Sequence, residues 1–146
     1  SEHTASFDII YETLSRTTLS KVQIGDMINI ERAMKYGDEI GGHNVSGHID
    51  NMAEIINIDT PENNHIVKLK IPDNYMPYII EKGYIALDGC SLTIAKVFDE
   101  GFSVCLIPET LRRTTFGFKK EGDLVNFEIE ANTKAIVDSI NKKRGE

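Results

Sequence analysis

The chain contains one segment twice, and this duplication limits its fold more than any other feature. The first copy begins at Tyr11 with YETLSRTTLSKVQIGDMINIER, and the second begins at Ile107 with IPETLRRTTFGFKKEGDLVNFEIE. Identical residues recur at an offset of 97 positions with no gap: Glu12 and Glu109, Thr13 and Thr110, Leu14 and Leu111, Arg16 and Arg113, Thr17 and Thr114, Thr18 and Thr115, Gly25 and Gly122, Asp26 and Asp123, Asn29 and Asn126, and Glu31 and Glu128. So many identities in one register indicate an internal repeat.

The repeat also predicts how the chain divides into domains. The second copy ends near Glu130, so the first ends near Ala33, 97 residues earlier. An intact tandem would begin about 60 residues before Ser1. We therefore expect the C-terminal part of a first unit at 1–33, a complete second unit at 34–131, and a C-terminal helix at 132–146 that docks on its own unit or on a neighbouring subunit.

Charge and hydropathy exclude two classes of partner. The chain has 16 basic and 23 acidic residues and a net charge of −7. A nucleic-acid surface requires clustered Lys and Arg, so we expect no nucleic-acid partner. No apolar stretch approaches the roughly 20 residues of a membrane-spanning helix, so we expect no membrane partner.

The two cysteines, Cys90 and Cys105, are predicted to be free thiols. If residues 98–101 form a hairpin turn, Ile94 faces Cys105, and Cys90 then lies about 13 Å further along the strand. That separation exceeds disulfide reach. Free thiols are typical of a reducing compartment, so we expect a cytoplasmic protein.

The hydrophobic pattern predicts a mainly β fold. Alternating apolar residues and turn signals predict strands at 6–11, 27–31, 46–58, 66–71, 84–97 with a break at Asp88-Gly89, 102–107 and 124–131. About six short strands per repeat favour tandem six-stranded antiparallel Greek-key-type β-barrels, the first incomplete here.

Two helices are expected beside these strands. The internal helix at 73–82 is predicted to be capped by Asp73 or Asn74. The C-terminal helix at 132–143 is predicted to be capped by Asn132 or Thr133, with one apolar stripe of Ala135, Ile136 and Ile140.

The polar segment GGHNVSGHID, residues 41–50, is a candidate ligand-binding loop. His43, His48 and Asp50 are candidate metal ligands, but a spacing of five between the two histidines places their rings on opposite faces of an extended segment. No Cys/His cluster elsewhere completes such a site, so we expect no metal. The remaining interpretations are a loop with solvated histidines and a ligand contact through His48.

Two further segments are candidates for binding a planar ligand. In DGCSLTI, Ser91 and Thr93 share one face of a strand, and two hydroxyls facing the same way can bind the polar edge of a heterocycle. In IPET, Pro108 ends strand pairing and leaves neighbouring backbone groups available. An ordinary solvent-facing strand and a plain turn are the alternatives. Because IPET recurs as YET at 11–13, two related sites are expected.

Three segments resemble the riboflavin synthase family: ERAMKYGDEIGGHNVSGHID, KGYIALDGCSLTI and LIPETLRRTTFG, in the family's order and spacing. The resemblance covers nearly the whole chain. It implies that two molecules of 6,7-dimethyl-8-ribityllumazine dismutate to riboflavin and 5-amino-6-(D-ribitylamino)uracil without a metal or cofactor, in the last step of riboflavin biosynthesis. It also implies a homotrimer, in which the first barrel of one subunit meets the second barrel of a neighbour.

The resemblance also implies which residues contact substrate. The second-barrel ligand would lie against Ser91, Leu92, Thr93, Ile107, Pro108, Glu109, Thr110, Leu111 and Arg112. The first-barrel ligand would lie against Asp8, Ile9, Ile10, Tyr11, Glu12, Thr13, Gly47, His48 and Ile49, with Lys82 contributed across the interface.

For catalysis, His48 would move a proton, while Ser91 and Thr93 would orient the ring. Asp88, Glu130 and Lys82 would balance charge. The family usually has Asp where this chain has Glu130, which extends one methylene further.

Two other functions remain open on the same barrel fold. One is a non-catalytic lumazine- or flavin-binding protein. The joint presence of SGH, SLT and IPET favours the enzyme over this binder. The other is the flavin-binding barrel of an oxidoreductase, which usually contains an Arg-x-Tyr-Ser segment that this sequence lacks.

Overall fold

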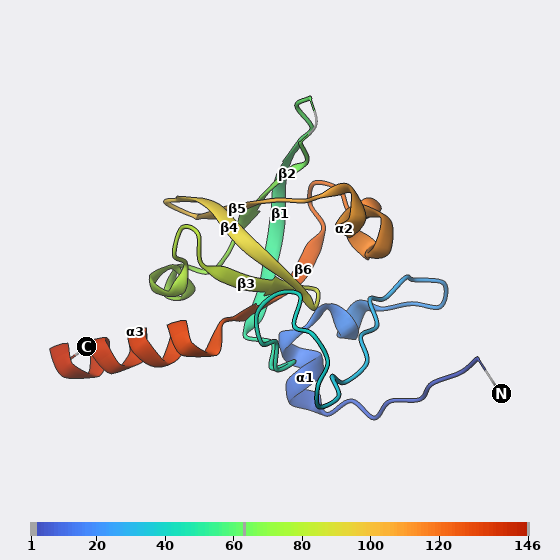
Figure 1. Ribbon diagram of the computed structural model, residues 1–146, viewed down its shortest axis with the longest axis horizontal. Helices are drawn as coiled ribbons and strands as arrows, with labels where there is room; N and C mark the ends of the chain where they lie inside the picture. Colours follow the sequence, from blue (N-terminus) through green and yellow to red (C-terminus); the bar gives the residue numbers. More distant parts are fainter. Residues whose placement is uncertain (1–2, 63, 146) are drawn as a thin grey trace.

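The centre of the molecule is a closed antiparallel barrel of six strands (Figure 1). The computed structural model describes residues 3–62 and 64–145. The strands are β1 (Asn51–Asp59), β2 (Ile66–Lys70), β3 (Tyr84–Leu87), β4 (Cys90–Phe98), β5 (Gly101–Cys105) and β6 (Leu124–Ile129). They close in the order β1-β2-β5-β4-β3-β6. Closure pairs both edges of every strand and confirms the predicted β-barrel.

Alternation along the strands fills the interior of this barrel. The apolar residues that alternate in the predicted strand at 66–71 face inward: Val67, Leu69 and Ile71 are at most 2% exposed, whereas Lys70 faces outward. Burying each such side chain contributes about 1.5–3 kcal/mol. The predicted division of β4 into two faces is also confirmed: Leu92 and Ile94 are buried, while Ser91 is half-buried and Thr93 is exposed.

Short helices connect and extend the barrel. They are α1 (Tyr11–Arg16), η1 (Thr18–Lys21), η2 (Asp73–Tyr78), α2 (Pro108–Arg113), η3 (Thr115–Gly117) and α3 (Ala131–Arg144), where η marks a 3₁₀ helix. Figure 1 shows α3 running outward from the barrel toward the C-terminus. Its contact with the barrel side includes a 2.6 Å hydrogen bond from Tyr78 Oη to Asp138.

The two copies of the repeat fold alike where both are helical. The bounds of α1 are those of α2 minus 97, and η1 begins 97 residues before η3. In each copy a threonine hydroxyl donates a hydrogen bond of 2.7 Å to the carbonyl oxygen four residues earlier, from Thr17 to Thr13 and from Thr114 to Thr110. The same hydroxyls accept from Leu19 N and Phe116 N. The local sequence therefore specifies the same helix pair twice.

Two predicted strands are wrong. Residues 6–10 and 27–31 are irregular, and Phe7 and Met27 are each 73% exposed. A strand is stable only when a neighbour accepts and donates its backbone hydrogen bonds. Within the described residues, neither segment pairs with a neighbouring strand. The predicted strand at 46–58 begins only at Asn51 and ends at Asp59.

Three finer predictions also need correction. The predicted helix at 73–82 is a six-residue 3₁₀ helix whose N-cap is Pro72, because Pro77 cannot donate the backbone hydrogen bond that a longer α-helix needs. The cap of α3 is Glu130 rather than Asn132 or Thr133. Ile94 pairs with Val104 rather than Cys105, because β4 has an irregularity between Ile94 and Lys96.

Cys90 and Cys105 are both free, as predicted. Burial, reinforced by the nearby Asp88 carboxylate, raises the pKa of Cys90 to about 11. Cys105 is exposed.

A thiol reacts through its thiolate, so at about pH 8 we expect one thiol per chain to react rapidly with a disulfide reagent. The Cys105→Ser variant should lose the fast phase and Cys90→Ser should keep it; the reverse assignment would contradict the effect of burial.

Candidate functional site

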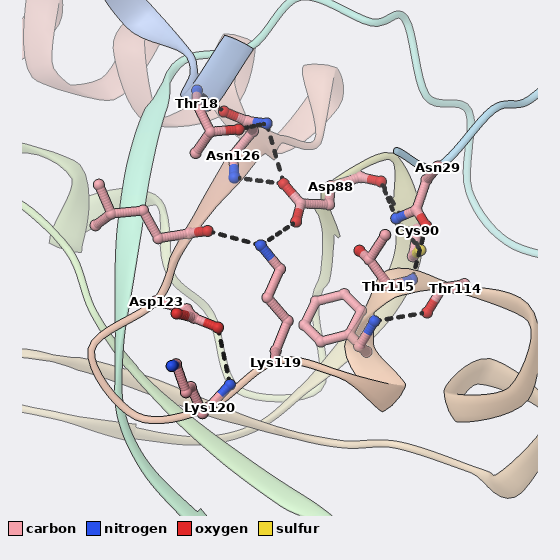
Figure 2. Close-up of polar contacts among 12 residues, drawn as sticks. Thr18, Asn29, Asp88, Cys90, Thr114, Thr115, Lys119, Lys120, Asp123 and Asn126 are labelled. Atoms are coloured by element: carbon pink, nitrogen blue, oxygen red, sulfur yellow. Dashed lines mark hydrogen bonds and ion pairs between the residues drawn. The ribbon is translucent and has the colours of Figure 1, made fainter. Parts of the chain in front are cut away.

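Two asparagines at equivalent repeat positions join the two copies reciprocally. Asn126 Oδ1 of the second copy accepts from Thr18 N of the first at 2.7 Å. Asn29 Oδ1 of the first copy accepts from Thr115 N of the second at 2.8 Å. Thr18 and Thr115 are themselves 97 residues apart, as are Asn29 and Asn126. Figure 2 shows these contacts in one region, so the contact between copies has an internal pseudo-twofold pattern.

Asp88 lies at the centre of this contact (Figure 2). Its Oδ1 accepts from the backbone N and the Nδ2 of Asn126 at 2.8 and 3.0 Å. Its Oδ2 lies 3.3 Å from Lys119 Nζ, and its backbone carbonyl accepts from Asn29 Nδ2 at 2.9 Å. Asp88 has a φ of 45°, in the left-handed region, as befits the turn between β3 and β4. The carboxylate therefore supports the contact between copies.

An open cavity of about 940 Å³ lies along the same contact. Its lining includes the polar side chains of Thr13, Lys21, Asp88, Lys119 and Asp123. Of the residues predicted to bind substrate, Thr13, Gly47 and Ile49 line it.

Two carboxylates, Glu128 and Asp50, link the glycine-rich segment 41–50 to the barrel and to α3 through hydrogen bonds and an ion pair. Glu128 on β6 is only 5% exposed and accepts from Ser46 N, Ser46 Oγ and Gly47 N at 2.7, 2.7 and 2.9 Å. Asp50 accepts from Ile129 N at 2.9 Å and forms an ion pair with Lys134 on α3. These contacts hold the segment against one end of the barrel.

His48 and Ser46 form a pair within this segment. His48 Nδ1 lies 3.0 Å from Ser46 Oγ, and His48 N donates to the same oxygen at 3.3 Å. The His48 side chain is exposed. Its ring is thus held on one edge by a hydroxyl that is itself bonded to Glu128.

His43 contacts the predicted site strand directly. Ser91 Oγ accepts from His43 N at 3.0 Å and lies 2.7 Å from His43 Nδ1. The His43 ring stacks on Tyr84 with centroids 5.2 Å apart. Burial lowers the pKa of His43 despite the opposing attraction of Glu130 and Glu128. The sequence indicated His43 as a metal ligand or as a solvated loop histidine, and no local signal indicated its contact with Ser91.

The remaining predicted site residues lie on different elements of the fold. Burial pushes the pKa of Glu130 upward, but hydrogen bonds from Asn132 and Thr133 outweigh it and hold the pKa below its ordinary value. Glu109 in α2 pairs with Arg112 and Arg113. Lys82 N donates to Ile94 O at 2.9 Å, which ties the turn before β3 to β4. Residues 8–10 are irregular, and 11–13 form the start of α1.

No described residues form a group of three or more His, Cys, Asp or Glu side chains suited to hold a metal. Of the described helices, none has the length and apolar character needed to cross a membrane.

The sequence profile of the lumazine binding domain matches residues 46–130. Riboflavin synthase from Chlamydia muridarum is 44% identical over 140 residues, which cover 96% of this chain and 69% of that protein. The chain belongs to the riboflavin synthase family. Membership in the riboflavin synthase family confirms the resemblance carried by the three sequence segments.

Other members of the riboflavin synthase family are more similar in sequence. The Escherichia coli (strain K12) enzyme is 50% identical over 138 residues, which cover 94% of this chain and 65% of the relative. The enzyme from Buchnera aphidicola subsp. Schizaphis graminum is 52% identical over 134 residues, covering 91% and 64%. The chain therefore spans about 65% of the length of the Escherichia coli riboflavin synthase.

Solved structures with a similar fold include LumP. Its complex with riboflavin has a TM-score of 0.72 at 26% identity, covering 81% of this chain and 64% of LumP. Its complex with 6,7-dimethyl-8-(1'-D-ribityl) lumazine has a TM-score of 0.72 at 24% identity, covering 82% and 64%. The second similarity supports the barrel fold alone.

Proposed function

We propose that this chain carries lumazine-binding and catalytic residues of a riboflavin synthase. The reaction is the dismutation of two 6,7-dimethyl-8-ribityllumazine molecules to riboflavin and 5-amino-6-(D-ribitylamino)uracil. The observation that carries the proposal is 50% identity to the Escherichia coli riboflavin synthase over 94% of the chain. The matched region includes the segments SGH, SLT and IPET, from which the candidate site is built.

In this proposal the second-barrel ligand binds against β4 and the start of α2. Ser91 and Thr93 present hydroxyls on the outer face of β4 and hydrogen-bond the polar edge of the ring. The residues from Ile107 to Arg112 supply backbone groups and the apolar surface of Ile107, which is 62% exposed. Leu92 lies on the other face of β4 and is buried in the barrel core.

The first-barrel ligand binds against residues 8–13 and 47–49, with Lys82 contributed by a neighbouring subunit. The lumazine 7-methyl group is a carbon acid already acidified by its conjugated ring. It needs a base of modest strength and accurate placement. Bringing two such rings into one orientation is the largest contribution that a protein can make to this reaction.

His48 is the proposed base, since its exposed imidazole is accessible to substrate and histidine is the side chain that most often serves as a general base. Proton abstraction breaks a C–H bond of the 7-methyl group and transfers the proton to an imidazole nitrogen of His48. The negative charge that remains is delocalised over the lumazine ring. Asp88, Glu130 and Lys82 balance charge around this step. No metal or cofactor takes part.

Assembly as a homotrimer completes the proposal. On α3, Ile136 is 60% exposed and Ile140 is 45% exposed, so part of the predicted apolar stripe is available to a neighbouring subunit. The two free thiols suit the cytoplasm, where we place the protein.

A non-catalytic binder is the alternative function, since LumP is described in complexes with lumazine and riboflavin. Identity favours the enzyme: 50% to riboflavin synthase against 26% to LumP. The test incubates the purified protein with the lumazine and follows loss of its absorbance together with growth of riboflavin fluorescence. Turnover supports the enzyme, whereas tight lumazine binding with no riboflavin formed would establish the binder.

A further inference from the structure

We propose that Ser46 and Glu128 are positioning residues that hold neutral His48 as the Nδ1–H tautomer and leave Nε2 as the proton acceptor. The use of that acceptor in catalysis rests on the proposed function. The tautomer itself follows from three short contacts and can be tested without any turnover.

The Ser46 hydroxyl faces the Glu128 carboxylate. Ser46 Oγ lies 2.7 Å from Glu128 Oε1. The same buried carboxylate accepts two backbone N–H groups, from Ser46 and Gly47. In all three contacts Glu128 is the acceptor, and a carboxylate group accepts hydrogen bonds through its oxygens. Ser46 therefore donates its single hydroxyl hydrogen to Glu128.

The same Ser46 oxygen also contacts two nitrogens of His48. With its hydrogen committed to Glu128, Ser46 Oγ can only accept from other groups. His48 N donates to it at 3.3 Å, and His48 Nδ1 lies 3.0 Å away. Nδ1 must then carry a hydrogen. A neutral imidazole has one N–H, so Nε2 keeps its lone pair and is the basic nitrogen.

His43 shows why the carboxylate matters. Ser91 Oγ lies 2.7 Å from His43 Nδ1, a contact of similar length to that of His48 with Ser46. Among the described hydrogen bonds, however, Ser91 has no carboxylate to take its hydrogen, so this hydroxyl can itself donate to Nδ1. A serine beside a histidine is therefore not enough to select a tautomer; the Glu128 contact decides it for His48.

The repeat supplies a matched control. Glu31 is the counterpart of Glu128, 97 residues earlier, and its side chain is exposed. Replacing Glu31 removes the same charge and the same residue type without touching Ser46 or Gly47.

The same contacts act during the reaction. When Nε2 takes the proton from the 7-methyl group, both ring nitrogens carry hydrogen and the ring becomes a cation. Nδ1–H then continues to donate to Ser46, which remains bonded to the Glu128 carboxylate. The carboxylate thereby stabilises the imidazolium through one hydroxyl. Without Ser46, the ring is free to adopt the Nε2–H form that free histidine favours in water, and Nε2 is then no longer an acceptor.

The test reads the tautomer by two-bond proton–nitrogen correlation NMR on the ¹⁵N-labelled chain, at a pH where His48 is neutral. We expect the Nδ1–H pattern for His48, with the resonance assigned through its absence in His48→Gln. Ser46→Ala and Glu128→Gln should each shift His48 toward the Nε2–H pattern, whereas Ser46→Thr, which keeps a hydroxyl, and Glu31→Gln should leave it unchanged. An amide fingerprint spectrum confirms that each variant is folded.

An Nε2–H pattern in the unmodified chain, or an unchanged pattern in folded Ser46→Ala, would overturn the tautomer assignment. In a preparation that turns lumazine over, Ser46→Ala should lower kcat about 10-fold or more with little change in KM, and Ser46→Thr should restore it. If the unmodified chain shows the Nδ1–H pattern and Ser46→Ala loses it but keeps full activity, the tautomer assignment stands and the positioning role in catalysis is overturned.

Discussion

Replacing His48 by glutamine lowers kcat for lumazine turnover by about 100-fold or more, the usual contribution of a general base. Glutamine keeps much of the volume and hydrogen-bonding capacity of the ring but cannot accept a proton near neutral pH. Because His48 is exposed and outside the barrel core, the variant should fold normally. The measurement is steady-state riboflavin formation, with KM determined separately from kcat.

The matched control is His3→Gln, which changes an exposed histidine outside the candidate site. It should keep full activity. Unchanged kcat in folded His48→Gln would exclude His48 as the base while leaving the family membership and the lumazine site intact. A rise in KM alone would assign His48 to substrate contact.

Replacing Gly101 by alanine lowers the free energy of unfolding by about 3 kcal/mol or more, at the upper end of overpacking effects. Gly101 is the first residue of β5 and pairs with both Lys70 on β2 and Phe98 on β4. A Cβ built at Gly101 would overlap the Leu69 carbonyl oxygen and lie 2.9 Å from the Leu69 carbonyl carbon. Both atoms belong to backbone that is held within the closed barrel, so relief requires the strands to separate.

Gly41→Ala is the control for this change. A Cβ at Gly41 meets no atom within 4 Å, and its backbone is not in the left-handed region. We expect its effect to stay within about 0.5 kcal/mol, as is usual for surface substitutions. Urea unfolding monitored by circular dichroism compares the two variants. Equal stability of Gly101→Ala and the unmodified chain would mean that β5 is not held as closely as the structure places it.

Much of the barrel was predictable because strand pattern is a local property. Alternation in 66–71 correctly assigned Val67, Leu69 and Ile71 to the interior. The turn residues Asp88 and Gly89 correctly separated β3 from β4. The same reasoning failed for 6–10 and 27–31, whose apolar alternation resembles that of a strand. A strand also needs a hydrogen-bonding partner, and alternation carries no information about whether one is adjacent.

The candidate site was less predictable because its residues are joined by long-range contacts. The segment SGH was identified as a ligand loop, yet the carboxylate that holds it, Glu128, lies 82 residues away from Ser46. Asp88 was expected to balance charge near the reaction. In the structure it bonds Asn126, 38 residues away, at the contact between copies. His43 was not expected to contact Ser91, since loop and strand are 48 residues apart.

By itself, the sequence determined that one fold unit is repeated at a spacing of 97 residues, that its strands alternate, and that the segments SGH, SLT and IPET belong to the riboflavin synthase family. These properties depend on residue identity and local periodicity, which can be read along one dimension. Only the tertiary structure decided which carboxylate holds which loop, and that equivalent asparagines exchange hydrogen bonds between the copies. Barrel closure brings these groups together, and a buried polar group must then find its partner wherever the fold has placed it.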